Sequence, residues 1–346
     1  MELPEASVAR HLAAFRETGF CVLPELLAAD EVERVRAAFA RHRAQKPANW
    51  TSRGADSRGG PTGESGRWQT NHGLRVQPDE VGFVARHPAV LQLVAALIGD
   101  SARFRSLGCM LREPVLEPPP AGVPEAFREQ GIHWQLWHRE AGGAHRPDHP
   151  LCIPSLQVIA YFDDCNRRSH CFSIVPETVE HKRGLPTGFR LEKQTASDRA
   201  KTRHLIVDPS SPTGSKSMWQ NVPLAGREDW PLASTGVDVV GKAGTVIIQN
   251  NHNLHSGTVR QSERPRRTIH CVYHNLTDEA VATSLAPAQE EKEEEGGSPA
   301  ATTAAAQFLA QVPEHQQWMF DSQSLQNFYQ HDEPELGAVA GVGARL

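Results

Sequence analysis

Two histidines and one glutamate in this sequence have the side-chain types and the spacing of a metal site. His138 and Glu140 lie at the end of a β-prone run, 132–138, and residues two apart on a strand point to the same face. His255 follows a second such run, 244–249. Two imidazoles and one carboxylate on one face of an ion leave three coordination positions open, as non-haem Fe(II) oxygenases need for a co-substrate and O₂.

Two other histidines compete for these positions. His133 lies in the triplet His133-Trp-Gln135, but a glutamine lacks the charge that a hard divalent ion prefers. His252 precedes His255 by three residues in a polar segment. A His-x-Glu triplet is weak evidence by itself, so the residues alone leave these alternatives open.

A possible anchor for a co-substrate lies eleven residues after His255, at Arg266. Strand alternation places Arg266, Thr268 and His270 on one face. An arginine buried in a barrel needs an anionic partner, and the distal carboxylate of 2-oxoglutarate would supply one as a two-pronged ion pair. The alternative is that Arg266 and Arg267 are solvated cations at a strand edge.

These candidate residues lie among many short β-prone runs that proline and glycine clusters separate. The runs are 103–112, 132–138, 155–163, 171–176, 203–208, 236–240, 244–249 and 267–274. Their order, without intervening helices, favours a sandwich or jelly roll over a parallel α/β sheet. Gln157 and Tyr161 alternate inward on one of them, where they add hydrogen bonds to a ligand or serve as ordinary polar packing.

The regions on either side of these strands have a different character. Residues 5–43 predict a helix, a short strand at 20–23 and a second helix, and 87–99 predicts a further helix that Gly99 ends. Residues 47–67 are rich in Gly, Ser, Arg and Pro and predict a long loop. After Asn275 the chain becomes acidic and Ala-rich, and the aromatic residues beyond this linker predict one or two short helices that dock back or bind elsewhere.

Composition and charge narrow the function classes. A net charge of −5 argues against a general nucleic-acid binder, and no apolar run approaches the length that spans a bilayer. The six cysteines show no paired spacing, which indicates reduced thiols in an intracellular, cytoplasmic protein. The ending Ala344-Arg345-Leu346 is similar to a peroxisomal address, with a chance match as the alternative. The sequence does not set the oligomeric state.

Taken together, these segments resemble the phytanoyl-CoA dioxygenase family, in order, over roughly residues 8–275. The segments that carry the resemblance are Phe15–Pro24, the helix 87–100, Trp137–Glu140, 156–176, 181–184, Gly244–Val246, Leu254–Gly257 and Pro265–Ile269. This colinearity is more specific than any one motif.

The resemblance implies a mainly β fold with flanking α-helices, a double-stranded β-helix of the jelly-roll, cupin-like type. It implies Fe(II) held by His138, Glu140 and His255, 2-oxoglutarate anchored by Arg266, and O₂ as the oxidant. Glu140 replaces the usual aspartate, and a carboxylate there favours hydroxylation over halogenation, which needs that position vacant for halide. The expected activity is hydroxylation of a C–H bond in a small-molecule or acyl substrate that the sequence does not identify.

We expect the chain to divide into three parts. Residues 1–275 form the oxygenase domain, with a helical part at 1–100 and the jelly-roll core at 101–275. Residues 276–306 form the acidic low-complexity linker, and 307–346 form a tail with short helices. Two rivals remain: a barrel that has lost turnover and serves as a binding or scaffold protein, and a zinc hydrolase, for which no general base is placed as in a zinc protease helix.

Overall fold

The computed structural model describes most of the predicted domain and part of the tail. The described residues are 2–45, 47, 50–52, 67–70, 78–119, 121, 128–134, 153, 155–174, 176, 190–192, 205–207, 237–251, 253, 255–275, 299–320 and 325. Within these ranges no helix is long and apolar enough to cross a membrane.

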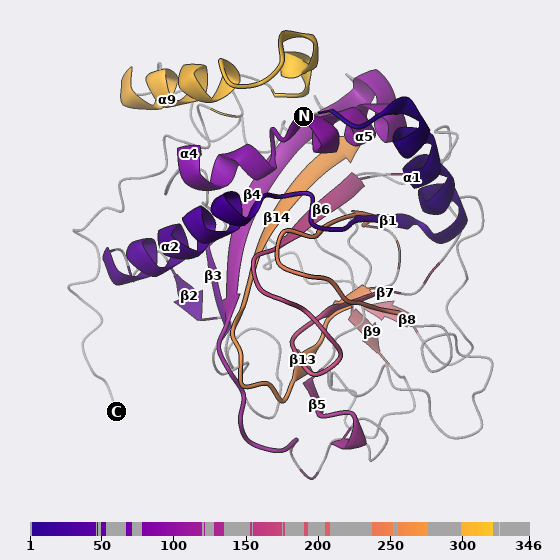
Figure 1. Ribbon diagram of the computed structural model, residues 1–346, viewed down its shortest axis with the longest axis vertical. Coiled ribbons are helices and arrows are strands. Elements are labelled where there is room, and N and C mark those ends of the chain that lie inside the picture. The colour runs from indigo at the N-terminus through magenta and orange to yellow at the C-terminus, as the bar shows by residue number, and fades with distance from the viewer. Residues whose placement is uncertain are drawn as a thin grey trace.

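The largest element is an antiparallel seven-stranded sheet (Figure 1). Its strands, in spatial order, are β1 (Phe20–Leu23), β11 (Val246–Asn250), β6 (Ser155–Tyr161), β14 (Arg266–Asn275), β4 (Ala102–Arg112), β3 (Arg67–Thr70) and β2 (Thr51–Ser52). A second, three-stranded sheet has the order β10 (Val237–Val239), β7 (Phe172–Ile174) and β12 (His255–Gly257). Two further antiparallel pairs join β13 (Val259–Arg260) to β5 (Ile132–Trp134) and β8 (Arg190–Glu192) to β9 (Leu205–Val207).

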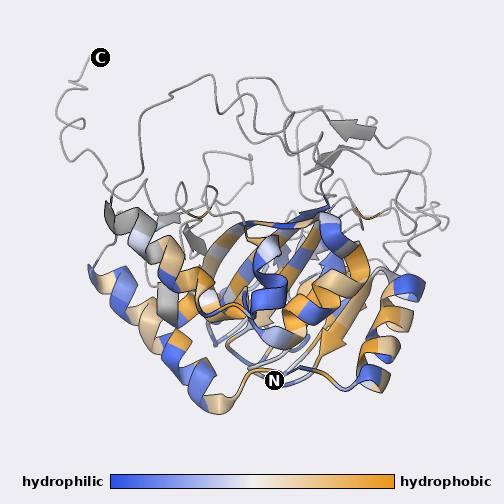
Figure 2. Ribbon diagram, turned by 90° about the horizontal axis from the view of Figure 1, so that it is seen from above, coloured by the Kyte–Doolittle hydropathy of each residue, from blue (hydrophilic) through white to orange (hydrophobic). Residues whose placement is uncertain are grey.

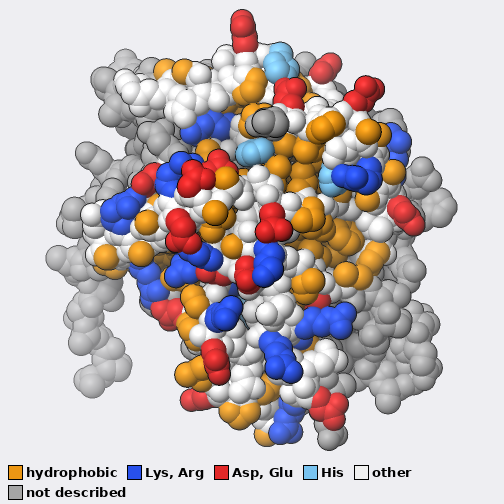
Figure 3. Space-filling view, in the orientation of Figure 1, with side chains coloured by type: hydrophobic (Ala, Val, Ile, Leu, Met, Phe, Trp, Pro, Cys, Tyr) orange, Lys and Arg blue, Asp and Glu red, His pale blue; other side chains and the backbone are white. Residues whose placement is uncertain are grey.

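Helices cover one face of the large sheet (Figure 2). They are α1 (Glu5–Thr18), α2 (Ala29–Gln45), α4 (Pro78–Val81), α5 (Pro88–Ile98) and α9 (Pro299–Leu309), with short 3₁₀ helices at Gly82–Val84, Gly99–Ser101 and Glu314–Met319. Gly19 ends α1 at a φ of 77°, a conformation that glycine adopts without steric cost. Figure 3 shows acidic and basic side chains interspersed over the helical side of the molecule.

Strand alternation divides the large sheet into two faces with separate cores. Leu156, Val158 and Ala160 of β6 pack under the helices in the larger core. Ile159 and Tyr161, which alternate with them, pack with the three-stranded sheet in a smaller core. We call the face of the large sheet that meets the three-stranded sheet the interior face. By the same alternation, the predicted site residues Gln157, Tyr161 and Arg266 lie on this face.

The prediction of antiparallel sheets with flanking helices is therefore confirmed. Two regions differ in detail from the expectations. The stretch 47–67, expected to be a loop, contains strand β2 and the first residue of β3. Helix α9 begins at Pro299, inside the predicted linker 276–306, because proline suits the first turn of a helix and the alanines that follow are strong helix formers.

The C-terminal segment docks on the domain through aromatic side chains. Phe308 and Phe320 lie in the larger core, and their ring centroids are 6.5 Å and 5.2 Å from that of Phe104. Tyr273 of β14 contacts the Phe104 ring at 5.6 Å. The segment beyond the low-complexity stretch thus completes the packing of the sheet that carries Arg266.

Removing this contact should destabilise the whole domain. Phe308 is 1% exposed, so Phe308→Ala should lower the free energy of unfolding by about 3–5 kcal/mol through lost burial and the cavity left behind. Urea denaturation measures the loss, with Gln307→Ala at an exposed position of the same helix as the control. Equal stability of the two variants would show that the segment is not part of the cooperative fold.

Candidate metal and co-substrate site

His255 is the described member of the predicted metal triad. It opens β12, which pairs with β7 so that His255 lies opposite Ile174. The side chain is 3% exposed, and its Nδ1 lies 2.8 Å from the Asn253 carbonyl oxygen. When Nδ1 donates its proton to that carbonyl, the lone pair is on Nε2, which is the form of histidine that binds a metal.

The other two predicted ligands, His138 and Glu140, lie outside the described residues, as does the competitor His252. Within the described ranges no group of three or more potential ligands comes together. The neighbouring strand pair still bears on the choice of ligands, because β5 and β13 place Trp134 opposite Val259.

His133 is the competitor that the structure does describe. It precedes Trp134, which pairs with Val259, so it lies on the side of this pair away from His255 in the antiparallel register. This position favours residues after Trp134 over His133 as the partner of His255.

Arg266 is a buried cation on the interior face. Its side chain is 3% exposed, and Nη1 donates to the His170 carbonyl oxygen at 2.5 Å. Its Nε is buried without a hydrogen-bond partner, and none of the described carboxylates forms an ion pair with it. A buried guanidinium in this state is costly unless an anion completes it.

The adjacent Arg267 shows the opposite arrangement. It lies on the other face of β14, and its Nη1 is 2.8 Å from Asp163 Oδ1, while its backbone N–H donates to Oδ2 at 2.7 Å. Arg36 adds a second cation to the same carboxylate at 3.5 Å. Two neighbouring arginines are thus distinguished by their partners, since Arg267 has its carboxylate and Arg266 does not.

A second buried arginine, Arg112, lies directly across the ladder from Arg266. Its side chain is 5% exposed and reaches the second sheet, where Nη2 donates to the Gly257 carbonyl oxygen at 3.2 Å. A Cβ at Gly257 would lie 3.3 Å from this nitrogen, so glycine suits the close approach. The sequence analysis did not identify Arg112 as a site residue. Arg112 ends the predicted run 103–112, but its pairing with Arg266 follows only from the strand register.

His170 is a fully buried histidine beside Arg112 and Arg266. Burial, and then the charges of Arg112 and Arg266, lower the pKa of His170 to about 3, so the imidazole is neutral at physiological pH. Its Nδ1 accepts from the Arg260 backbone N–H at 3.1 Å, and Nε2 lies 3.1 Å from the Glu113 carbonyl oxygen. A neutral histidine adds no positive charge beside the two arginines.

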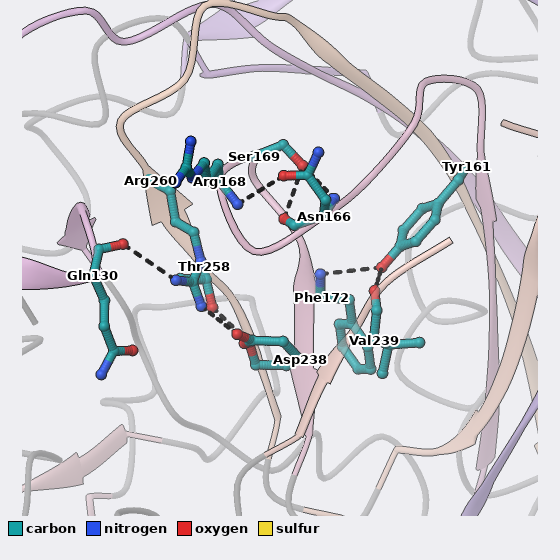
Figure 4. A network of polar contacts seen from close by, with 11 residues as sticks. Gln130, Tyr161, Asn166, Arg168, Ser169, Phe172, Asp238, Val239, Thr258 and Arg260 are labelled. Atoms are coloured by element: carbon teal, nitrogen blue, oxygen red, sulfur yellow. Dashed lines mark hydrogen bonds and ion pairs between the residues drawn. The ribbon is translucent and has the colours of Figure 1, made fainter. Parts of the chain in front are cut away.

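The hydroxyl of Tyr161 joins the two sheets through two hydrogen bonds to the backbone (Figure 4). Its hydroxyl donates to the Val239 carbonyl oxygen at 2.9 Å and accepts from the Phe172 N–H at 3.1 Å. A carboxylate needs donors, and the only proton of this hydroxyl is already used. The prediction that Tyr161 binds the co-substrate therefore lacks support, and its place in the fold is that of a tether.

An ion pair between a buried arginine and a partly exposed aspartate holds the strands around this tether (Figure 4). Arg260 Nη2 is 2.6 Å from Asp238 Oδ2, and the Ser173 hydroxyl donates to the other carboxylate oxygen at 2.6 Å. The Ser173 and Thr258 hydroxyls lie 2.7 Å apart. These contacts connect β10, β7 and β13, and so fix the sheet that presents His255.

Gln157 faces the interior opposite Gln249, whose Nε2 donates to the Gln157 Oε1 at 2.8 Å. The amide nitrogen of Gln157 keeps its two protons for other acceptors. Of the two residues predicted to assist Arg266, Gln157 therefore has a donor to offer and Tyr161 does not.

Comparison with known proteins adds independent information. The family described as phytanoyl-CoA dioxygenase (PhyH) matches residues 15–268. The epimerase SnoN in complex with Fe³⁺, alpha ketoglutarate and nogalamycin RO is 17% identical, with a TM-score of 0.51 over 78% of this chain and 84% of its own. HygX from Streptomyces hygroscopicus with nickel, 2-oxoglutarate and hygromycin B bound is 16% identical, with a TM-score of 0.47 over 79% and 87%. The likeness to SnoN shows the fold alone, and no curated protein matches the sequence significantly.

The low pKa of His170 makes a pH dependence testable. Its folded-state pKa lies below the unfolded value of 6.5, so the unfolded chain takes up a proton between about pH 6.5 and 3 that the folded chain does not. Its contribution to stability is complete above pH 6.5 and is lost as the pH falls, by on the order of 1 kcal/mol per pH unit. Urea unfolding from pH 7 to 5 should show a shallower slope for His170→Gln than for wild type or the exposed His315→Gln. Identical slopes would contradict a neutral buried His170.

Proposed function

Because this chain belongs to the phytanoyl-CoA dioxygenase family, we propose that it is an Fe(II)- and 2-oxoglutarate-dependent dioxygenase that hydroxylates a C–H bond. The observation that carries the proposal is Arg266, a buried guanidinium on the interior face with an unpartnered Nε and no described carboxylate beside it. An α-keto diacid supplies the missing anion. The substrate is a small molecule or an acyl group.

We propose a double-stranded β-helix as the fold of the core. Two antiparallel layers face each other across the smaller hydrophobic core, and Tyr161 joins them. The likeness to SnoN at a TM-score of 0.51 supports the same architecture. In such a barrel the ligand lies between the layers, where Arg266 points.

His138, Glu140 and His255 are the proposed metal ligands. His138 comes four positions after Trp134, and His255 comes four positions before Val259, the partner of Trp134. If the antiparallel ladder continued in the same register, His138 would lie opposite His255, with Glu140 on the same face two residues further. This supports His138 over His133, which lies on the far side of Trp134 from His255.

Arg266 is the proposed contact with the distal carboxylate of the co-substrate, while a contact through Gln157 stays a prediction. The guanidinium fork suits a carboxylate, which would satisfy the Nε that the fold leaves without a partner. Arg112 adds a second positive charge at the same level of the sheet. Gln157 lies on β6, the strand that pairs with β14, opposite Val272 and six residues along β14 from Arg266.

The metal with its keto acid, when bound, supplies the oxidising power: 2-oxoglutarate, O₂ and a C–H bond give succinate, CO₂ and an alcohol. The protein supplies position and protection. Asn253 holds His255 in the metal-binding tautomer, and Arg266 fixes the far end of the keto acid. The apolar side chains of Ile159, Phe172 and Ile174 exclude water from the inner end of the barrel.

The alternative, a barrel without turnover that serves as a scaffold, differs in what it needs from these residues. A scaffold gains nothing from a buried cation that costs stability, and a hydrophobic residue at position 266 would serve it better. An enzyme that binds a dianion needs this charge. Turnover measurements decide between the two.

Loss of a metal ligand should abolish activity. Since outer-sphere partners of a metal already cost 10–100-fold, His255→Ala, His138→Ala and Glu140→Ala should each reduce succinate formation by about 100-fold or more. His133→Ala is the matched control and should keep bound iron and near-normal turnover. If His133→Ala loses iron and His138→Ala does not, the ligand assignment is wrong.

The two neighbouring arginines provide a second test. Arg266→Ala should raise the half-saturating concentration of 2-oxoglutarate by about 30-fold or more, since truncating one partner of a buried charge pair costs about 2 kcal/mol or more. Arg267→Ala removes the contact with Asp163 and should lower stability with little effect on that concentration. An equal rise in both variants would contradict a specific role for Arg266.

A further inference from the structure

Four polar side chains gather on the interior face at one end of the large sheet. They are Ser155 and Gln157 of β6 and Gln249 and Asn251 at the end of β11, and we call them the polar tetrad. Gln249 lies directly opposite Gln157 in the register, and the Asn251 N–H donates to the Ser155 carbonyl oxygen at 3.1 Å. The two strands thus present them as two adjacent pairs.

The tetrad lies at the end of the sheet from which the chain crosses to His255. Strand β11 ends at Asn250, and β12 begins with His255 in the second sheet. Further along the same face, Ile159 and Ile247 form an apolar pair across the same two strands. The interior therefore changes from apolar to polar toward the end that leads to the proposed metal ligand.

Three atoms of the tetrad are buried without a hydrogen-bond partner in the described part of the protein. They are Ser155 Oγ, Gln249 Oε1 and Asn251 Oδ1. Ser155 and Gln249 are fully buried, and Asn251 is 3% exposed. Among the side chains of the tetrad, the one hydrogen bond joins the amides of Gln249 and Gln157. Whichever of the two amides donates, one of the two amide oxygens has no partner within the pair.

Unsatisfied buried acceptors cost stability, and a fold that needed only packing here would have apolar side chains, as it has at Ile159 and Ile247. Two of the three orphan atoms are carbonyl oxygens, which accept hydrogen bonds and cannot donate. A hydroxyl or an amine supplies the donors that such oxygens need. An acyl chain supplies none.

We infer that the polar tetrad binds hydrogen-bond donors of the substrate, which is therefore a hydroxyl- or amine-bearing small molecule and not an acyl chain. This inference rests on the proposed function, because it places the substrate beside the site of 2-oxoglutarate. The carboxylate of the co-substrate has its own partner in Arg266, six residues away from Val272, the residue of β14 that pairs with Gln157.

The first test measures thermal unfolding of the metal-free protein. Gln249→Leu removes an amide whose oxygen has no partner, so its Tm should stay within about 2 °C of wild type or rise. Asn275→Leu is the control, because Asn275 Nδ2 donates to the Ile153 carbonyl oxygen at 2.7 Å and its Oδ1 accepts from Ser101. This variant should lose about 4 °C or more. An equal loss in Gln249→Leu would show that the fold itself uses the amide, and would overturn the inference.

The second test uses the iron-loaded protein and separates substrate from co-substrate. Gln249→Leu should leave the half-saturating concentration of 2-oxoglutarate in uncoupled turnover unchanged. A tenfold rise would assign the tetrad to the co-substrate instead. Stimulation of succinate formation by decanoyl-CoA, equal in wild type and Gln249→Leu, would also overturn the assignment. Absence of any 2-oxoglutarate turnover in the wild type would remove the proposed function, and the substrate assignment with it, whatever the unfolding data show.

Discussion

The structure depends on a positive charge held on the interior face of the large sheet without a described counter-charge. Arg266 is buried, its Nε lacks a partner, and Arg112 lies opposite it on the next strand. A buried guanidinium without an anion destabilises the fold, so the surrounding elements must be stable enough to hold it there. The neighbour Arg267 shows that the same strand can neutralise an arginine where no ligand is needed, through Asp163.

The rest of the molecule supplies that rigidity. Strand β14 lies in the middle of the large sheet, between β6 and β4, and the aromatic side chains of the C-terminal segment pack behind it. Tyr161 ties this sheet to the backbone of β7 and β10, and the Arg260–Asp238 pair joins β13 to the same layer. His255 and Arg266 therefore belong to two layers that these contacts hold together, as the proposed shared site would require.

Local signals in the sequence predicted much of this architecture. The alternation of Arg266, Thr268 and His270 against Ile269 and Cys271, and most of the short strands, follow from a period of two that needs no partner strand. The contacts of Arg112, His170 and Gln249 could not be predicted, because each depends on a register between strands far apart in the sequence. The hydrogen bonds of the Tyr161 hydroxyl could not be predicted for the same reason, because its partners belong to the second sheet. His138 and Glu140 remain a prediction from sequence and family.

The central claim, that one site holds both the metal and the keto acid, is tested most directly by anaerobic titration of the purified protein with Fe(II) and 2-oxoglutarate. The account predicts a saturable visible metal-to-ligand charge-transfer band that requires both components, reaches one equivalent of each, and disappears in His255→Ala. Absence of the band in wild-type protein, with metal analysis showing no bound iron, would contradict the account and leave a protein kept for binding alone.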